Sequence, residues 1–117
     1  MILIFEKNMK FPLLLDIYGA TLSERRREIV GYYYNDDLSL SEISEITGIS
    51  RQGVRDSIKK SEDEINTLEE KLGIARKNRL ISDSLDSLEK ALAGNGSPDV
   101  LKRIEEIRSI VSTDETE

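Results

Sequence analysis

Residues 38–60 read LSLSEISEITGISRQGVRDSIKK, and this pattern predicts two short helices joined by a tight turn. Ser39 and Glu42 have the spacing of a capping box, so the first helix is expected to begin there. Gly48 is expected to end it, because glycine enters the left-handed conformation without a Cβ clash. The stretch therefore predicts a helix-turn-helix unit.

The second helix of this unit presents long polar side chains. Ser50 is its expected N-cap, and Val54 and Ile58, four residues apart, form its inner side. A short helix with long donors on its free face is suited to the DNA major groove, where Arg pairs with guanine and Gln with adenine. Asp56 either accepts from cytosine or pairs with a basic neighbour in the protein. The predicted base-reading residues are Arg51, Gln52, Arg55 and Asp56.

Phosphate contacts are expected from Ser50 and Lys59, and from Arg25, Arg26 and Arg27 in the preceding helix. Three arginines in the first turn of a helix oppose the helix dipole, a cost that phosphate groups would offset. The alternative for these side chains, and for those on the second helix of the unit, is an ordinary solvated helix face.

The composition argues against an enzyme. The 117 residues include 34% charged and only 5% aromatic residues, which favours helices over sheets, and there is no Cys, His or Trp. Imidazole and thiolate sites are therefore excluded, and we expect no cofactor and no metal.

The apolar start MILIF is too short for a signal peptide or a membrane span, so a cytoplasmic protein without membrane contact is expected.

The acidic charge is concentrated in the C-terminal half. Residues 61–117 hold 14 of the 23 acidic residues but only 8 of the 17 basic ones, so they carry the whole net charge of −6. Residues 22–60 have as many basic as acidic residues. A unit without net charge can still bind DNA if its basic side chains cluster on one face.

Amphipathic helices are predicted on both sides of the unit. Residues 11–19 and 22–35 form helices before it, with most of Tyr32, Tyr33 and Tyr34 in the core. The second helix continues past Lys60, because apolar residues follow a heptad spacing up to Ala75. These narrow apolar stripes must pack on one another, on the N-terminal core or on a second copy of the chain. We favour the second copy, with an intramolecular helical hairpin as the main alternative. The predicted organisation is an arm (1–9), a core (10–60), oligomerisation helices (61–111) and a disordered acidic tail (112–117).

A family resemblance follows from these residues. The run LSERRREIVGYYYNDDLSLSEISEITGISRQGVRDSIKKSEDEINTLEEKLGI, preceded by PLLLDIYGATL, resembles the YlxM-type helix-turn-helix proteins of Gram-positive bacteria and mycoplasmas over residues 10–74. The core is also similar to region 4 of sigma-70-type RNA polymerase factors. The resemblance implies a sigma-region-4-like core with a C-terminal helical extension, and a regulatory link to the signal recognition particle pathway.

Together these observations predict an all-α, non-enzymatic protein that binds double-stranded DNA as a homodimer or higher oligomer and has a regulatory role. The alternative is an adaptor that uses the same fold to bind protein or signal-recognition RNA, with a component of the signal recognition particle as a possible partner. The acidic C-terminal half favours this alternative.

Overall fold

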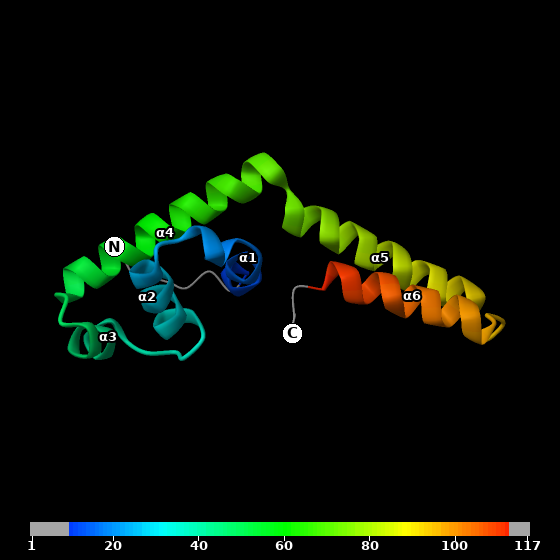
Figure 1. The fold of residues 1–117 in the computed structure, drawn as a ribbon, viewed down its shortest axis with the longest axis horizontal. Coiled ribbons are helices and arrows are strands. Elements are labelled where there is room, and N and C mark those ends of the chain that lie inside the picture. Colours follow the sequence, from blue (N-terminus) through cyan, green and yellow to red (C-terminus); the bar gives the residue numbers. More distant parts are fainter. Residues whose placement is uncertain (1–9, 113–117) are drawn as a thin grey trace, which may run out of the picture. The chain divides into compact units, whose positions relative to one another are not determined.

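The computed structural model describes residues 10–112, and its contacts divide the chain into two units at Leu72 and Gly73. The sequence placed the corresponding boundary after Lys60. The predicted arm (1–9) and residues 113–117 of the predicted tail lie outside the described part. The described residues form α-helices and one short 3₁₀ helix, with no strand among them, which confirms the all-α fold (Figure 1).

The helices are short before the turn of the helix-turn-helix unit and long after it. Within residues 10–112, no helix is both long enough and apolar enough to cross a bilayer. The N-terminal unit contains α1 (Phe11–Tyr18), the 3₁₀ helix η1 (Gly19–Thr21), α2 (Glu24–Tyr34), α3 (Leu40–Thr47) and α4 (Arg51–Leu72), and the C-terminal unit contains α5 (Ile74–Leu92) and α6 (Pro98–Val111).

The predicted helix ends are confirmed around α3. The Ser39 hydroxyl accepts a hydrogen bond from the Glu42 N–H at 3.0 Å, and the Glu42 carboxylate accepts one from the Ser39 N–H at 2.8 Å. Gly48 has a left-handed backbone, with φ of +77°, and stops the helix. Each end therefore satisfies backbone groups that a helix terminus leaves unpaired.

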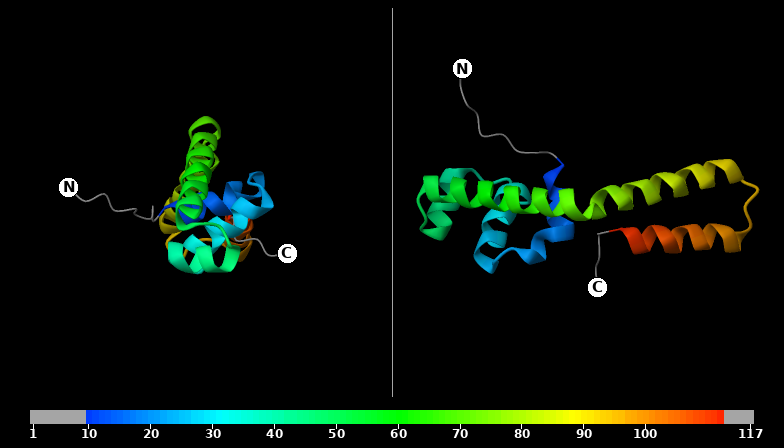
Figure 2. Two further views of the ribbon diagram at one scale, coloured as in Figure 1. Left: turned by 90° about the vertical axis from the view of Figure 1, so that its left-hand side faces the viewer. Right: turned by 90° about the horizontal axis from the view of Figure 1, so that it is seen from above.

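The core of the N-terminal unit lies between α4 and the three shorter helices. Each of α1, α2 and α3 packs against α4 (Figure 2). Tyr33 is buried, while Tyr32 and Tyr34 are half-buried and pack against the core, as the sequence predicted. One group of buried residues joins α1 and α2 to the middle of α4, namely Phe11, Leu15, Tyr18, Leu22, Val30 and Ile65. A second group supports the helix-turn-helix unit and consists of Ile29, Tyr33, Ile43, Val54 and Ile58.

The seam of α4 is occupied within the chain. Val54, Ile58, Ser61 and Ile65 are fully buried, and Val54, Ile58 and Ile65 belong to the two core groups just described. The expectation that this part of the seam packs on a second copy is therefore wrong. The heptad spacing correctly marked an apolar stripe, but α1, α2 and α3 cover it.

The C-terminal unit is a helical hairpin, the alternative that the sequence left open. α5 begins after Gly73, which has a left-handed φ of +63°, and ends at Ala93 and Gly94, which are also left-handed. The Ser97 hydroxyl accepts a hydrogen bond from the Val100 N–H at 3.3 Å, and Pro98 occupies the first turn of α6. These residues reverse the chain so that α6 packs back on α5.

Candidate nucleic-acid interface

The turn between α3 and α4 is held by side-chain hydrogen bonds. The Ser44 hydroxyl donates to the carbonyl oxygen of Ile49 at 2.6 Å. The Thr47 hydroxyl donates to the Ile43 carbonyl at 2.8 Å and accepts from the Ile49 N–H at 3.2 Å. The angle between the two helices therefore depends on polar contacts within the turn as well as on the apolar core.

A close approach explains the glycine in the first turn of α4. A Cβ atom at Gly53 would lie 2.7 Å from Cγ2 of Ile49 and 3.2 Å from the Ser50 hydroxyl oxygen. Real Cβ contacts are essentially never as short as the first of these. Glycine lowers helix propensity by about 1 kcal/mol relative to alanine, but here it lets the turn pack directly on the helix that it precedes.

The first two turns of α4 border an open hollow of about 490 Å³ on the protein surface. The start of α3 forms its other side. Two of its lining residues are arginines and none is acidic, although the chain as a whole carries a net charge of −6. The lining residues are Ser39, Leu40, Ser41, Arg51, Gln52 and Arg55.

The structure brings the predicted base-reading residues together on the exposed side of α4. Arg51, Gln52, Arg55 and Asp56 are all exposed, and Val54 behind them is fully buried. Nη1 of Arg51 is 3.5 Å from the Ser41 hydroxyl, at the long limit for a hydrogen bond. Nε2 of Gln52 donates to Oδ1 of Asp56 at 2.8 Å, so Asp56 has an amide partner within the helix rather than a basic one.

The three consecutive arginines of α2 have different environments. Arg25 donates from Nη2 to the Thr47 carbonyl at 2.9 Å and so connects α2 to the end of α3. The Arg27 side chain is exposed and forms no ion pair or hydrogen bond with the rest of residues 10–112. Of the three arginines, Arg25 and Arg27 have exposed side chains.

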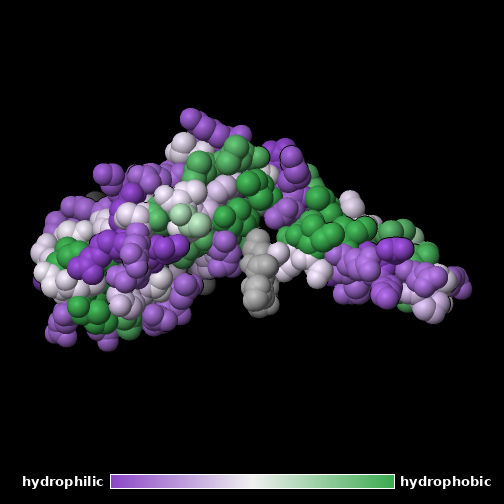
Figure 3. Space-filling view, in the orientation of Figure 1, coloured by the Kyte–Doolittle hydropathy of each residue, from purple (hydrophilic) through white to green (hydrophobic). Residues whose placement is uncertain are grey.

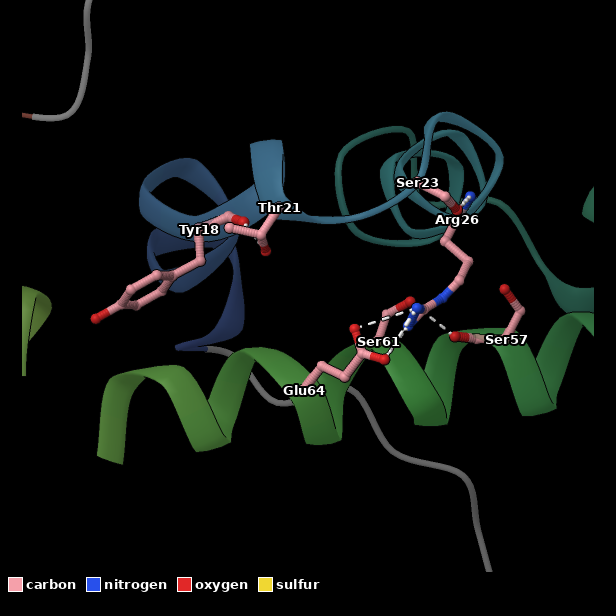
Figure 4. Close-up of polar contacts among 7 residues, drawn as sticks. All are labelled: Tyr18, Thr21, Ser23, Arg26, Ser57, Ser61 and Glu64. Atoms are coloured by element: carbon pink, nitrogen blue, oxygen red, sulfur yellow. Dashed lines mark hydrogen bonds and ion pairs between the residues drawn. The ribbon is translucent and has the colours of Figure 1, made fainter. Parts of the chain in front are cut away.

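Arg26 is directed inward, toward α4 (Figure 4). Its Nη1 donates to both carboxylate oxygens of Glu64 at 3.1 Å, and its Nη2 lies 2.8 Å from Oε2 of the same group. The Arg26 side chain is only 21% exposed, and its buried Nε has no hydrogen-bond partner in the described part of the chain. Arg26 therefore joins two helices and is not presented to a ligand.

The other predicted phosphate contacts are at the surface of α4. The Ser50 hydroxyl oxygen accepts a hydrogen bond from the Gly53 N–H at 3.0 Å, which confirms Ser50 as the cap and leaves its proton free to donate. Nζ of Lys59 is 3.2 Å from Oδ1 of Asp63, and both side chains are more than half exposed. Such a surface pair is weak and easily exchanged for another anion.

Ser39 and Ser41 are the residues of this surface that the sequence did not suggest as contacts. The capping box showed only that Ser39 begins a helix. It gave no sign that Ser41 lies beside Arg51, because that depends on how α3 packs on α4. Among residues 10–112 there is no cluster of three acidic side chains placed to hold a metal ion.

Comparison with known proteins agrees with this geometry. A family described as "Putative helix-turn-helix protein, YlxM / p13 like" (UPF0122) matches residues 5–107. The UPF0122 protein of Thermoanaerobacter sp. (strain X514) is 44% identical over 99 residues, covering 81% of this chain and 85% of that one. The UPF0122 protein of Acetivibrio thermocellus is 39% identical over 116 residues, covering 92% and 99%. The UPF0122 protein of Listeria innocua is 37% identical over 108 residues, covering 91% and 98%. The chain belongs to the YlxM / p13-like helix-turn-helix family.

Proposed function

We propose that this protein binds double-stranded DNA through the first two turns of α4 and acts as a regulatory protein. The observation that supports this function is the exposed group of Arg51, Gln52 and Arg55 around an open hollow without acidic lining. Val54 and Ile58 are fully buried directly behind this surface, so the donors project from a rigid support. Membership of a helix-turn-helix family agrees with DNA binding at a general level.

Each donor has a distinct role in this proposal. Arg51 and Arg55 donate to guanine, and Gln52 pairs with adenine while its amide remains bonded to Asp56. The amide of Gln52 has a second N–H and an oxygen, so the bond to Asp56 leaves one donor and one acceptor for a base edge. The role of Asp56 is then to orient Gln52.

Phosphate contacts come from the periphery of this surface. Ser50, Lys59, Arg25 and Arg27 remain in this set, and Arg26 does not, because Glu64 engages its guanidinium group. Ser41 joins the set because it lines the hollow at the start of α3. A homodimer or higher oligomer is the proposed binding form, since two helix-turn-helix units contact half-sites about one DNA turn, roughly 34 Å, apart.

Selection from random double-stranded DNA with the purified full-length protein tests this function. We expect an enriched sequence whose affinity falls steeply with salt, with a slope of log affinity against log salt of about −3 per chain, because three of the proposed phosphate contacts (Arg25, Arg27 and Lys59) are cationic. Failure to enrich any sequence, together with a slope near zero, would exclude the proposed function.

A non-enzymatic adaptor is the second candidate. The net charge of −6 weakens long-range attraction to DNA, and α3 exposes Glu42 and Glu45 next to the proposed interface. In this case the same surface would bind protein or the RNA of the signal recognition particle. Tight binding to that RNA, with duplex DNA binding at least about a hundredfold weaker, would favour the adaptor over the DNA-binding function.

A further inference from the structure

The C-terminal hairpin buries few apolar side chains. Among its described residues, only Ala75, Leu85 and Ile104 are buried hydrophobic residues. A unit of about 40 residues with so small a core does not normally fold unless something else covers it. Hydrophobic side chains are exposed along α5 (Figure 3). The large exposed apolar side chains after the start of α5 are Leu80, Leu88, Val100, Leu101, Ile107 and Ile110.

One face of the hairpin carries most of these side chains. Leu85 and Ile104 are the large residues that α5 and α6 bury. Ile81 and Val100 lie four residues before them, and Leu88 and Ile107 lie three residues after them. Because the helices of the hairpin are antiparallel, equivalent positions fall on the same side of it. We call this side, formed by Ile81, Leu88, Val100 and Ile107 with Leu80 and Ile110 beside them, the apolar face.

The opposite face carries ion pairs that join the two helices. Nη1 of Arg108 is 2.7 Å from Oδ1 of Asp86, and Nη2 is 2.8 Å from Oε1 of Glu89. The hydrogen bond to Asp86 is the main reason that the pKa of Arg108 lies above its usual value, with smaller contributions from Glu89 and Glu105. Asp86 and Glu89 follow Leu85 by one and four residues, and Arg108 follows Ile104 by four, so all three lie on the side of the hairpin away from the apolar face. The hairpin therefore has a closed polar face and an uncovered apolar one.

The charge pattern of both helices fits an antiparallel copy of the same helix. The first half of each helix has a net positive charge and the second half has a net negative charge. A parallel copy would place like charges together, whereas an antiparallel copy places each basic half against an acidic half. In α5, Arg76, Lys77, Arg79 and Asp83 precede Ser84, and Asp86, Glu89 and Lys90 follow it. Asp86 and Glu89 pair with Arg108 on the opposite face, so α5 contributes a net charge difference between its halves and no ion pair across the apolar face. In α6, Asp99, Lys102 and Arg103 precede Ile104, and Glu105, Glu106 and Arg108 follow it, which leaves one net positive charge before Ile104 and one net negative charge after it.

We infer that the apolar face binds a second copy of this chain, forming an antiparallel four-helix bundle from two hairpins. A two-fold axis near Ser84 places Leu80 of one copy against the partner's Leu88, because these leucines are equally spaced about Ser84. The same axis brings Arg103 near the partner's Glu106. The two-fold axis repeats each contact, so the partly exposed apolar side chains of one copy are covered by those of the other. Dimerisation through the C-terminal unit does not depend on DNA binding.

Sedimentation equilibrium of the full-length protein tests the apolar face. We expect a dimer, and we expect Leu88→Glu and Ile107→Glu each to raise its dissociation constant at least about a hundredfold, because a carboxylate would be buried in the contact. Leu101→Glu is the matched control. Leu101 is 40% exposed, close to the 42% of Ile107, but it precedes Ile104 by three residues and lies toward the ion-paired face. A monomeric wild type, or equal effects of Leu101→Glu and Ile107→Glu, would overturn the inference.

A charge exchange tests the orientation with variants that keep the apolar core intact. Arg103 and Glu106 form an exposed ion pair within α6, with 3.2 Å between Nη1 and Oε1. Arg103→Glu alone and Glu106→Arg alone place like charges across the two-fold axis, so each variant should dimerise about tenfold more weakly. An equimolar mixture should form heterodimers with nearly wild-type affinity. A mixture that associates no better than either variant alone would contradict the antiparallel arrangement.

Discussion

The Cγ2 methyl group of Ile49 lies directly over Gly53, so close that a Cβ at Gly53 would be 2.7 Å away. Ile49 is half-buried in the turn, and Gly53 is in the first turn of α4. The β-branched side chain of isoleucine has little rotamer freedom with which to move aside. The position of α4 relative to α3 therefore depends on the absence of a side chain at Gly53.

We expect Gly53→Ala to destabilise the protein by about 1 kcal/mol. Alanine adds about 1 kcal/mol of helix propensity, but overpacking against a well-packed neighbour costs about 1–3 kcal/mol. Urea unfolding followed by circular dichroism measures the difference. DNA affinity should fall as well, because the clash tilts the first turn of α4.

Gly31→Ala is the control for this substitution. Gly31 lies inside α2, and a Cβ there would meet only the Asn35 amide nitrogen, at an ordinary distance of 3.9 Å. The propensity gain then has no opposing clash, so this variant should be more stable by about 0.5–1 kcal/mol. Equal effects of the two substitutions would show that the contact with Ile49 has no influence.

Two serines on the helices of the unit should respond differently to replacement by alanine. Ser44 donates to the Ile49 carbonyl in the turn, a bond between two elements, so Ser44→Ala should cost about 1 kcal/mol. Ser61 is fully buried in α4 but donates to the Ser57 carbonyl of its own helix at 2.8 Å. Ser61→Ala leaves no buried group unpaired and should change stability by less than about 0.5 kcal/mol. Thermal unfolding of both variants checks the contrast, and a larger loss for Ser61→Ala would contradict it.

The local features of this fold could be predicted from sequence because short-range chemistry determines them. The capping box at Ser39 and the left-handed Gly48 depend on neighbours within a few residues, and both were predicted correctly. The heptad spacing of α4 showed that Ile58 and Ile65 lie on one apolar stripe. Spacing cannot show whether a stripe is covered by the same chain or by another, and the preferred interpretation was wrong for α4.

The candidate site shows the same limit. Arg25, Arg26 and Arg27 look alike in the sequence, but consecutive residues on a helix point about 100° apart. Only the packing of α2 on α4 directs Arg26 to Glu64 and leaves Arg27 exposed. The contact between Ile49 and Gly53 was likewise hidden, since it depends on the path of the turn in three dimensions.

The Arg26–Glu64 pair should contribute more to stability than a similar pair on the surface. Glu64→Ala leaves the largely buried guanidinium group of Arg26 without its only carboxylate partner in the described residues, which should cost about 1–2 kcal/mol. Asp63→Ala removes the exposed partner of Lys59 from the adjacent position of α4 and should cost less than about 0.5 kcal/mol. Urea unfolding compares the two variants, and equal losses would show that the partial burial of Arg26 has no consequence.

Arg55→Ala should weaken binding to the selected DNA sequence by about 1–3 kcal/mol and relax the base preference at one position. Arg55 is exposed and lines the hollow beside Arg51 and Gln52, where no lining residue is acidic. Gel-shift titration against the selected sequence and against a set of single-base variants measures both effects.

Lys71→Ala provides the matched control, because it removes the same charge from the exposed last turn of the same helix. The two side chains are separated along α4 by about 24 Å, at 1.5 Å per residue. Lys71→Ala should leave the base preference unchanged, because loss of a distant charge affects every sequence equally. If both substitutions weaken binding to the same extent at every base, then Arg55 contributes only charge, and α4 does not read the groove.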